Sequence, residues 1–330
     1  MELDLETFLT TLYVMVDDLY QSHVQPQMPP HGGPPPQRAD REVLCLALAA
    51  QWRRGVPWAS ERGCLRYLAQ HHRALFPGLT SQSAFNRRFR RLWGAFLILQ
   101  AAVAEQLVTP QECEIIDGVP VRVAHGARSF HPGWLAEIAR IGKGGNDRYF
   151  YGLHLRLCVS SGGIAAGWTL ASAKVQERWL AEWLFSARAG APQLTGPRDP
   201  TTGALRLEPP SDWVGPAQAC GPRSGKPVAA DLGFTGADWW AHWAHDYGVE
   251  VVTKPHPAPR ALTHWFSSLR QVVETAFSHL CESFGLQYPG AHTRWGLMTP
   301  VAAKLAAYNL GIWINRSLGR PDFAFATLIV

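Results

Sequence analysis

The pattern of apolar residues changes from helical to strand-like near residue 109, and this change constrains the fold more than any other feature. Strands are expected at residues 114–124, 149–160, 164–172, 227–232 and 249–254, and helices at 176–187, 237–247, 264–284 and 300–318. Ser161, Gly162 and Gly163 separate the second and third strands, which predicts an antiparallel hairpin. The order of elements predicts an α/β domain with one mixed five-stranded sheet that carries helices on both faces.

The part of the chain before this change is predicted to be all helical. Apolar residues three and four apart indicate an amphipathic helix at 3–20, and several short helices are expected between residue 40 and about 107, with Asp40, Ser60 and Ser81 or Ser83 as N-caps. Six prolines exclude a helix at 25–37, so a flexible loop is expected there. These patterns predict a helical domain at 1–110 and a second domain at 111–330.

A Gly- and Pro-rich stretch interrupts the second domain at about 190–226. It lies between a predicted helix and a predicted strand and carries no clear periodicity. Long segments of this kind inside a compact domain are usually functional or tolerated insertions. We therefore expect a surface loop with little regular structure.

The composition excludes several classes of protein. Only 17% of the 330 residues are charged and 47% are hydrophobic, which argues against disorder. The six cysteines are scattered without a CxxC pair, so a disulfide framework or a zinc finger is not expected. No apolar stretch reaches about 18 residues, and an acidic rather than basic start argues against a secretion signal. A soluble cytoplasmic protein without membrane association is predicted.

The most basic segment of the chain is an arginine-rich helix near residue 88. Phe85, Phe89 and Leu92 lie on one face of this helix, and the rest of its surface carries the arginines Arg87, Arg88, Arg90 and Arg91. A helix that packs on one side and faces phosphate on the other has this pattern. A solvated basic face explains it equally well. A preceding turn at 77–79 is compatible with a helix-turn-helix arrangement.

Three acids are candidate catalytic residues. Asp117 interrupts a buried apolar strand, Asp231 ends another strand, and Glu274 lies on the helix that follows. Each has a simpler explanation: Asp231 caps a turn, and Glu274 forms an exposed ion pair with Arg270. Together they make a carboxylate-only site, and such donors select Mg²⁺ or Mn²⁺ over zinc. Two such ions catalyse in-line phosphoryl displacement.

Several motifs in this region resemble the bacterial insertion-sequence DDE transposases, whose catalytic core is similar to RNase H and retroviral integrase. The motifs are IIDGVPV around Asp117, YFYG at 149–152, ASAKVQER at 171–178, VAADLGF around Asp231, RQVVETAFSHL at 270–280, TRWGL at 293–297 and LAAYNL at 305–310. One large subgroup has Tyr and Lys where this chain has Ser267 and Cys281, which favours a different subgroup.

The resemblance implies an RNase H-like catalytic domain and a role for each acid. Asp117 would bridge two Mg²⁺ ions, Asp231 would hold one of them, and Glu274 would complete the coordination of the other. Mn²⁺ is expected to substitute. DNA contacts are expected from the four arginines of the basic helix and from His154, Arg156, Lys254 and Arg270. Trp239, Trp240 and Trp243 are a weaker suggestion for base stacking, because aromatic residues at helical spacing usually belong to a core.

The predicted function is a transposase that binds the inverted-repeat ends of its mobile element and catalyses strand cleavage and strand transfer. Its partners would be double-stranded DNA and, during synapsis, at least a second copy of the chain, in a nucleoid-associated location. One alternative is an RNase H-like nuclease that uses the same acids without strand transfer. Another is a non-catalytic DNA-binding protein derived from a transposase, although the presence of all three acids counts against it.

Overall fold

The computed structural model describes residues 2–28, 39–79, 81–109, 111–124, 134–144, 149–190, 193–199, 201–220, 227–254, 257 and 259–330. The chain divides into two compact units. The first contains residues 1–103, 278–286 and 294–330, and the second contains residues 104–277 and 287–293. The expected domain boundary at 110 lies near the division at 103, but residues 294–330, expected in the second domain, belong to the first unit.

The first unit is helical. Its elements are α1 (Leu5–Leu19), the π-helical turn η1 (Tyr20–Val24), the 3₁₀ turn η2 (Gln25–Gln27), α2 (Asp40–Ala49), α3 (Glu61–His71), α4 (Gln82–Arg91), α5 (Trp93–Leu107), α9 (Arg294–Ser317) and η6 (Phe325–Thr327). The boundary between the units falls inside α5 and inside α8 (Arg260–Glu282). Trp52 lies in the core of this unit, with its ring centroid 5.0 Å from those of Phe8 and Phe284. Among the described residues, no helix is both long and apolar enough to span a bilayer.

Side-chain caps account for several helix starts. Ser60 accepts the N–H of Gly63 at the start of α3, and Ser81 accepts the N–H of Ala84 at the start of α4, as the sequence predicts. The predicted cap at Asp40 is wrong, because Asp40 is the first residue of α2 and its side chain pairs with Arg88 instead. The predicted loop at 25–37 begins with the short turn η2, and its residues 29–37 lie outside the described residues.

The second unit is built on a mixed sheet. Its elements are β1 (Glu114–Arg122), β2 (Arg140–Lys143), β3 (Tyr149–Ser160), β4 (Ala165–Ser172), α6 (Glu177–Arg188), β5 (Val214–Ala219), β6 (Val228–Ala230), the 3₁₀ turn η5 (Leu232–Phe234), α7 (Ala237–Tyr247), β7 (Val251–Thr253) and the first part of α8. Within the described part of the chain the sheet has seven strands in the order β5-β4-β3-β1-β6-β7, with β2 beside β3. β1, β6 and β7 are parallel, whereas β1, β3, β4 and β5 pair antiparallel.

The predicted hairpin and the α/β class are confirmed, but the strand number is wrong. The five predicted strands correspond to β1, β3, β4, β6 and β7, and β3–β4 is the antiparallel hairpin. β2 and β5 were not predicted. β5 lies within the stretch expected to lack regular structure, and it pairs with the edge of β4. Its sequence has little β propensity, and pairing with an available edge stabilises it.

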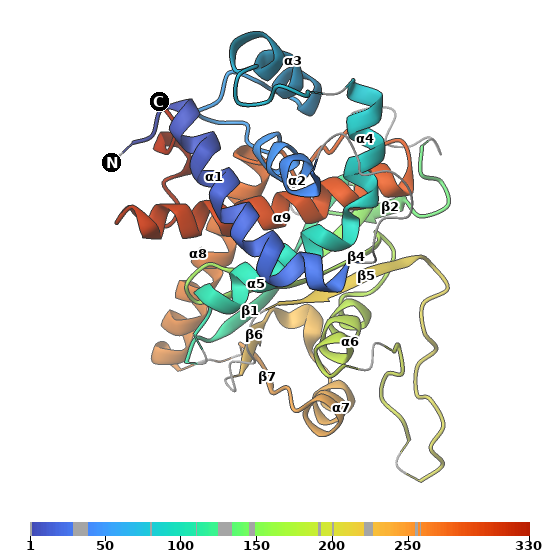
Figure 1. The fold of residues 1–330 in the computed structure, drawn as a ribbon. Helices are drawn as coiled ribbons and strands as arrows, with labels where there is room; N and C mark the ends of the chain where they lie inside the picture. The colour runs from blue at the N-terminus through green and yellow to red at the C-terminus, as the bar shows by residue number, and fades with distance from the viewer. Residues whose placement is uncertain are drawn as a thin grey trace. The chain divides into compact units, whose positions relative to one another are not determined.

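Helices α6 and α7 cover one face of the sheet (Figure 1). They bury an apolar cluster that includes Ile116 on β1, Trp179 and Leu184 on α6, and Trp243 on α7. At the far end of α6, Arg188 donates to both carboxylate oxygens of the buried Glu114 on β1, at 2.5 and 2.7 Å. This paired contact fixes α6 to the strand that carries Asp117.

Candidate active site

Asp117 and Asp231 occupy equivalent positions on neighbouring parallel strands. The register pairs Ile116 of β1 with Ala230 of β6, and each aspartate is the next residue along its strand. Neighbouring strands lie about 4.8 Å apart. The two carboxylates therefore lie at neighbouring positions of the sheet.

Side-chain alternation directs Asp117 away from the face that α6 and α7 cover. Ile116 belongs to the apolar cluster under these helices, and successive residues of a strand point to opposite faces. Asp117 therefore points to the other face of the sheet. The charge of Arg270, on α8, lowers the pKa of Asp117.

Asp117 is largely buried, and its electrostatic surroundings are mixed. Burial raises the pKa of its carboxyl above the ordinary value, and the negative charge of Asp231 adds to this effect. The N–H of Gly118, which donates to Asp117 Oδ1 at 2.7 Å, and the charges of Arg156 and Arg270 act in the opposite direction. Two aspartates that repel each other near arginines are an arrangement that a cation would stabilise.

An Arg156–Glu177 ion pair lies beside Gly118 on β1 and beside Gly233 in the turn after Asp231. Arg156 lies on β3 opposite Gly118, and its side chain is only 4% exposed. A Cβ at position 118 would lie 1.9 Å from Arg156 Nη1, and a Cβ at position 233 would lie 1.8 Å from Glu177 Oε2. Glycine is therefore required after Asp117 and two residues after Asp231, because the ion pair occupies the space where side chains would be.

Glu274 lies on α8 with Arg270 one turn before it. Arg270 Nε donates to Glu274 Oε1 at 2.9 Å, and the two side chains are 70% and 61% exposed. The simpler explanation considered from the sequence, an exposed ion pair, is thus present. Arg270 is also within electrostatic range of Asp117 and Asp231. Arg270 thus contacts Glu274 directly, and the charges of the two aspartates add to the rise in its pKa.

The donor set matches a hard divalent cation, although the carboxylates are not gathered into a coordination shell. Asp117 and Asp231 each accept one backbone N–H, from Gly118 and Gly233, which leaves their second oxygens without a hydrogen-bond partner among the described residues. Glu274 is paired with Arg270 and would have to exchange that partner for a metal. No group of three potential ligands is in place in the described part of the chain.

The other residues predicted to contact DNA in this unit differ in their surroundings. Lys254 follows β7 and is exposed. His154 stacks on Phe150, and burial, reinforced by the charge of Arg156, lowers its pKa to about 4. His154 is therefore uncharged at neutral pH and offers no positive charge to a phosphate. Arg156 is buried and paired with Glu177, so its side chain is not accessible to a phosphate in this structure.

The arginines of the first unit divide into two groups. Arg87, Arg90 and Arg91 on α4 are exposed. Arg88 donates to the buried carboxylate of Asp40 on α2 and is bound within the fold. Three of the four predicted phosphate-binding arginines therefore lie on an accessible helical surface.

The suggestion that the α7 tryptophans stack on bases is wrong for two of them. Trp239 and Trp243 are 2% and 0% exposed and pack in the apolar cluster, and Trp240 donates its indole N–H to the carbonyl of Phe234. Sequence reasoning also missed Glu177, the partner of Arg156. Its position in the ASAKVQER motif was the available signal, but nothing in the sequence showed that it faces the aspartate loops.

Comparisons of this chain with protein-family models, with curated proteins and with solved structures find no match.

Proposed function

We propose that the chain is a DDE transposase that binds the inverted-repeat ends of its mobile element and catalyses DNA cleavage and strand transfer. The observation that carries the proposal is the equivalent placement of Asp117 and Asp231 on adjacent parallel strands. On α8, Arg270 feels the charges of both aspartates and donates to Glu274 at 2.9 Å. The five strands expected for an RNase H-like core are all present, which supports that fold for the second unit.

In the proposed reaction, a water oxygen displaces the 3′ oxygen at the end of the element and leaves a 3′ hydroxyl. That hydroxyl then displaces the bridging oxygen of a target phosphodiester, so the bond broken in the target is replaced by the bond that joins element and target. Asp117, Asp231 and Glu274 would hold Mg²⁺ or Mn²⁺. Two such ions, when bound, activate the attacking oxygen and stabilise the leaving one.

The chain's own residues fix the carboxylates and neutralise charge. Gly118 and Gly233 each donate a backbone N–H that orients one aspartate. The Arg156–Glu177 pair fills the space beside these two glycines. Arg270 is exposed and next to the acids, so it would contact the phosphate backbone once Glu274 is turned away from it.

DNA binding by the first unit would use the exposed surface of α4. Arg87, Arg90 and Arg91 would neutralise phosphates, and each contact releases counterions from DNA. Replacing all three by Gln is expected to weaken DNA binding. The slope of the logarithm of the binding constant against log[salt] should become smaller in magnitude by about 2–3, because each lost phosphate contact removes about 0.9. Arg62→Gln, on α3 and outside this helix, is a control for a general loss of positive charge.

The catalytic test uses Asp117→Asn, Asp231→Asn and Glu274→Gln with a DNA duplex that carries the ends flanking the gene. Loss of a ligand carboxylate removes several kcal/mol of transition-state stabilisation, so Mg²⁺-dependent cleavage should fall about 100-fold or more. The exposed Glu250→Gln is the matched control and should cleave normally. Wild-type cleavage by all three variants would show that the site is misassigned.

Strand transfer separates the proposal from a simple nuclease. The wild-type chain should join pre-cleaved 3′ ends to target DNA and give branched or joined products. Cleavage without any joined product would favour an RNase H-like nuclease, and DNA binding without cleavage would favour a non-catalytic DNA-binding protein.

A further inference from the structure

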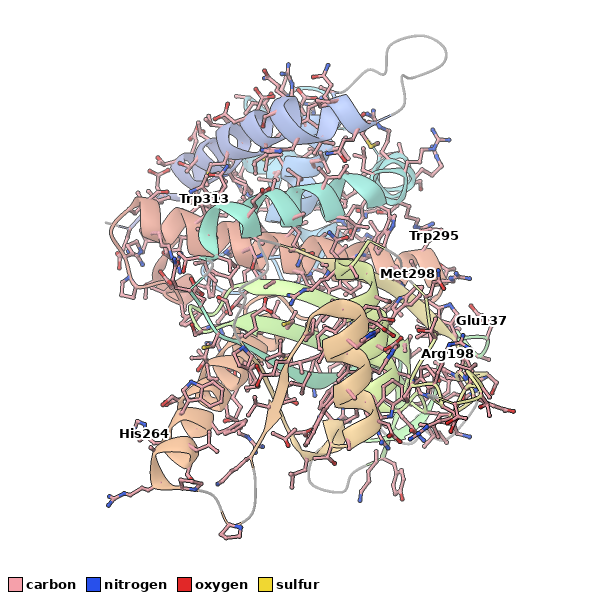
Figure 2. All side chains as sticks on the ribbon, turned by 90° about the horizontal axis from the view of Figure 1, so that it is seen from below. Glu137, Arg198, His264, Trp295, Met298 and Trp313 are labelled. Carbon is pink, nitrogen blue, oxygen red and sulfur yellow. The ribbon has the colours of Figure 1, made fainter. Side chains whose placement is uncertain are left out.

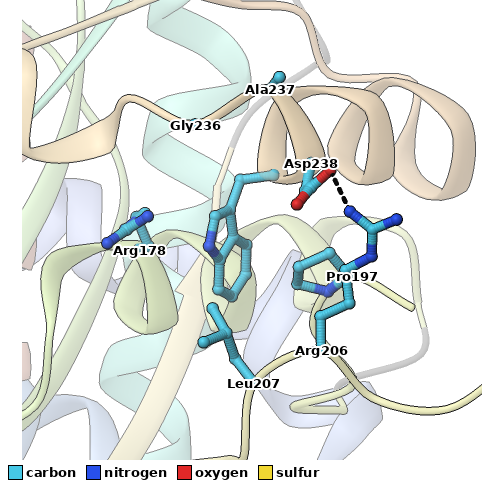
Figure 3. A pocket seen from close by; sticks show the side chains of 8 residues that line it. Arg178, Pro197, Arg206, Leu207, Gly236, Ala237 and Asp238 are labelled. Atoms are coloured by element: carbon cyan, nitrogen blue, oxygen red, sulfur yellow. Dashed lines mark ion pairs between the residues drawn. The ribbon is translucent and has the colours of Figure 1, made fainter. Parts of the chain in front are cut away.

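A pocket of about 500 Å³ lies in the second unit, where α6 and α7 begin. Figure 3 shows it from close by, with Arg178 and Gly236 on one side and Pro197, Leu207 and Arg206 on the other. Pockets of this size hold small organic ligands. It is separate from the acidic residues, although Arg178 directly follows Glu177, whose carboxylate contacts the loop after Asp231.

The N-terminus of α7 opens onto this pocket. The helix has 11 residues, and its N-cap, Gly236, has no side chain to satisfy the N–H groups of the first turn. These groups and the helix dipole make such an end attractive to anions. Gly236 has a φ of 148°, a conformation that side-chain-bearing residues rarely adopt, so the helix start stays uncovered.

An unpaired buried donor points to a ligand at the same place. Trp239 lines the pocket, is only 2% exposed, and its indole Nε1 has no hydrogen-bond partner among the described residues. A Cβ on Gly236 would lie 3.3 Å from Trp239 Cδ1 and 3.4 Å from Arg178 Nη1. Since Nε1 is bonded to Cδ1, the donor edge of the indole lies beside the guanidinium and the helix start. Three kinds of donor thus converge on one small region.

The charges of the lining residues favour an anion. Arg178 contacts only the carbonyl of Thr235, at 3.4 Å, and has no carboxylate partner among the described residues. Arg206, by contrast, pairs with Asp238 at 2.5 Å, as the dashed line in Figure 3 marks, and with Asp199 at 3.9 Å. Arg178 is therefore the cation that is free to bind a ligand.

The other walls suggest what the anion is attached to. Pro197, Leu207 and the ring of Trp239 give the pocket an apolar side, and Leu207 is 42% exposed. A phosphate group alone would leave this side uncovered. A nucleotide has a phosphate for the donors and a sugar and base for the apolar walls.

We propose that this pocket binds one nucleotide of a DNA strand, with the phosphate at Arg178, Trp239 and the start of α7, and the sugar and base against Pro197 and Leu207. This inference rests on the proposed function. It adds a subsite for a nucleotide that is not cut, next to the loop that carries Asp231. The negative charge of Asp238 repels the anion and lowers the affinity of the site. Its pairing with Arg206 partly neutralises that charge.

The test follows the indole N–H resonance of Trp239 by NMR in the full chain, where Trp239→Phe identifies it by its loss. A short single-stranded oligodeoxynucleotide should shift this resonance saturably. Trp52 and Trp58 also have unpartnered buried indole nitrogens, but they lie in the first unit, so their resonances should not move. Inorganic phosphate and a deoxynucleoside 5′-monophosphate are titrated in parallel.

Variants of the lining residues test the geometry. Arg178→Gln should weaken oligonucleotide binding at this site about tenfold or more, whereas Asp238→Asn, which removes the opposing charge, should strengthen it several-fold. No shift of the Trp239 resonance with any probe, or unchanged affinity in both variants, would overturn the proposal. Equal affinity for inorganic phosphate and for the oligonucleotide would overturn the assignment to a nucleotide.

The outcome is independent of catalysis. The exposed Glu250→Gln, outside the acidic site and the pocket, should bind the oligonucleotide at this pocket as the wild type does. If the acidic variants cleave DNA normally but the Trp239 resonance still shifts, the transposase assignment fails and the subsite stands. If the acidic variants lose cleavage but the Trp239 resonance does not shift, the nucleotide subsite is refuted and the transposase proposal stands.

Discussion

Loss of Glu182 should strongly destabilise the second unit. Glu182 lies on α6 with 0% exposure, and its carboxylate accepts from His242 Nε2 at 2.9 Å, Trp243 Nε1 at 2.9 Å and Tyr247 Oη at 2.6 Å, all on α7. It also accepts the hydroxyl of Thr195 at 3.1 Å and the N–H of Gly196 at 3.2 Å. One carboxylate therefore joins α6, α7 and the segment before Pro197, the three elements that form the nucleotide pocket.

The magnitude follows from what Glu182→Ala leaves behind. Each buried donor without a partner costs about 1–3 kcal/mol, which gives an upper range of about 5–15 kcal/mol for the five donors. Water entry and relaxation reduce this, and removing one partner of a buried ion pair usually costs about 3–5 kcal/mol. For a unit of about 180 residues this corresponds to a Tm lower by roughly 6–20 °C.

The effect should depend on pH in a defined direction. Burial alone raises the pKa of Glu182, but hydrogen bonds from His242, Tyr247 and Gly196 lower it overall, so its stabilisation is present above pH 4.5 and lost as the pH falls through the folded pKa. Burial lowers the pKa of His242, but Glu182 and Asp246 raise it overall. The stabilisation from protonated His242 is therefore fully present below pH 6.5 and is lost as the pH rises through the folded pKa. Asp246 also pairs with His245. The difference between wild type and variant should be largest between about pH 4.5 and 6.5.

The assay is thermal and urea unfolding followed by circular dichroism, with hydrogen exchange of the α6 and α7 amides. Glu182→Gln keeps the shape and one acceptor oxygen and should lose about half as much stability. The exposed Glu250→Ala is the control and should stay within about 0.5 kcal/mol of wild type. A Glu182→Ala variant as stable as Glu250→Ala would refute the reasoning that this carboxylate holds the helices together.

Three further substitutions test other parts of the structure. Gly118→Ala places a methyl group 1.9 Å from Arg156 Nη1, so DNA cleavage should fall at least tenfold while DNA binding by gel shift is unchanged. Lys304 is fully buried, and burial, with the charge of Arg53, holds its pKa well below the ordinary value. Unfolding free energy should therefore rise with pH below about 10.5 by up to about 1.4 kcal/mol per unit, and Lys304→Met should remove that slope in pH-dependent urea unfolding. Arg88→Ala removes the arginine that pairs with the buried Asp40 and should lower the unfolding free energy by roughly 1.5–3 kcal/mol, and urea unfolding with a loss under about 0.5 kcal/mol would contradict this.

Much of the secondary structure of both units could be predicted because its signals are local. The alternating run at 149–160 and the helix at 237–247 have the bounds that the sequence predicts, and Ser60 and Ser81 cap the helices that follow them. Pro300 misled the prediction of α9, which begins six residues earlier, at Arg294, and contains the proline. A proline inside a helix removes one backbone hydrogen bond, and it does not by itself set where the helix begins.

The candidate site was predicted in part. The sequence placed Asp117 and Asp231 at strand ends and Glu274 on a helix, because acids in apolar strands are conspicuous. It gave no sign that Glu177 would reach Arg156, or that His154 would be buried and uncharged at neutral pH. These features depend on which side chains meet across strands and helices far apart in the chain.

The sequence by itself determined the α/β class and five of the seven described strands, and it singled out the three candidate acids, because periodicity and charge are properties of short segments. Only the tertiary structure decided that β5 joins the sheet, that Arg156 is enclosed rather than exposed, and that Glu182 and the start of α7 form a network and a pocket. Strand edges, buried ion pairs and pockets arise from contacts between distant segments, and their energies depend on burial that no local pattern specifies.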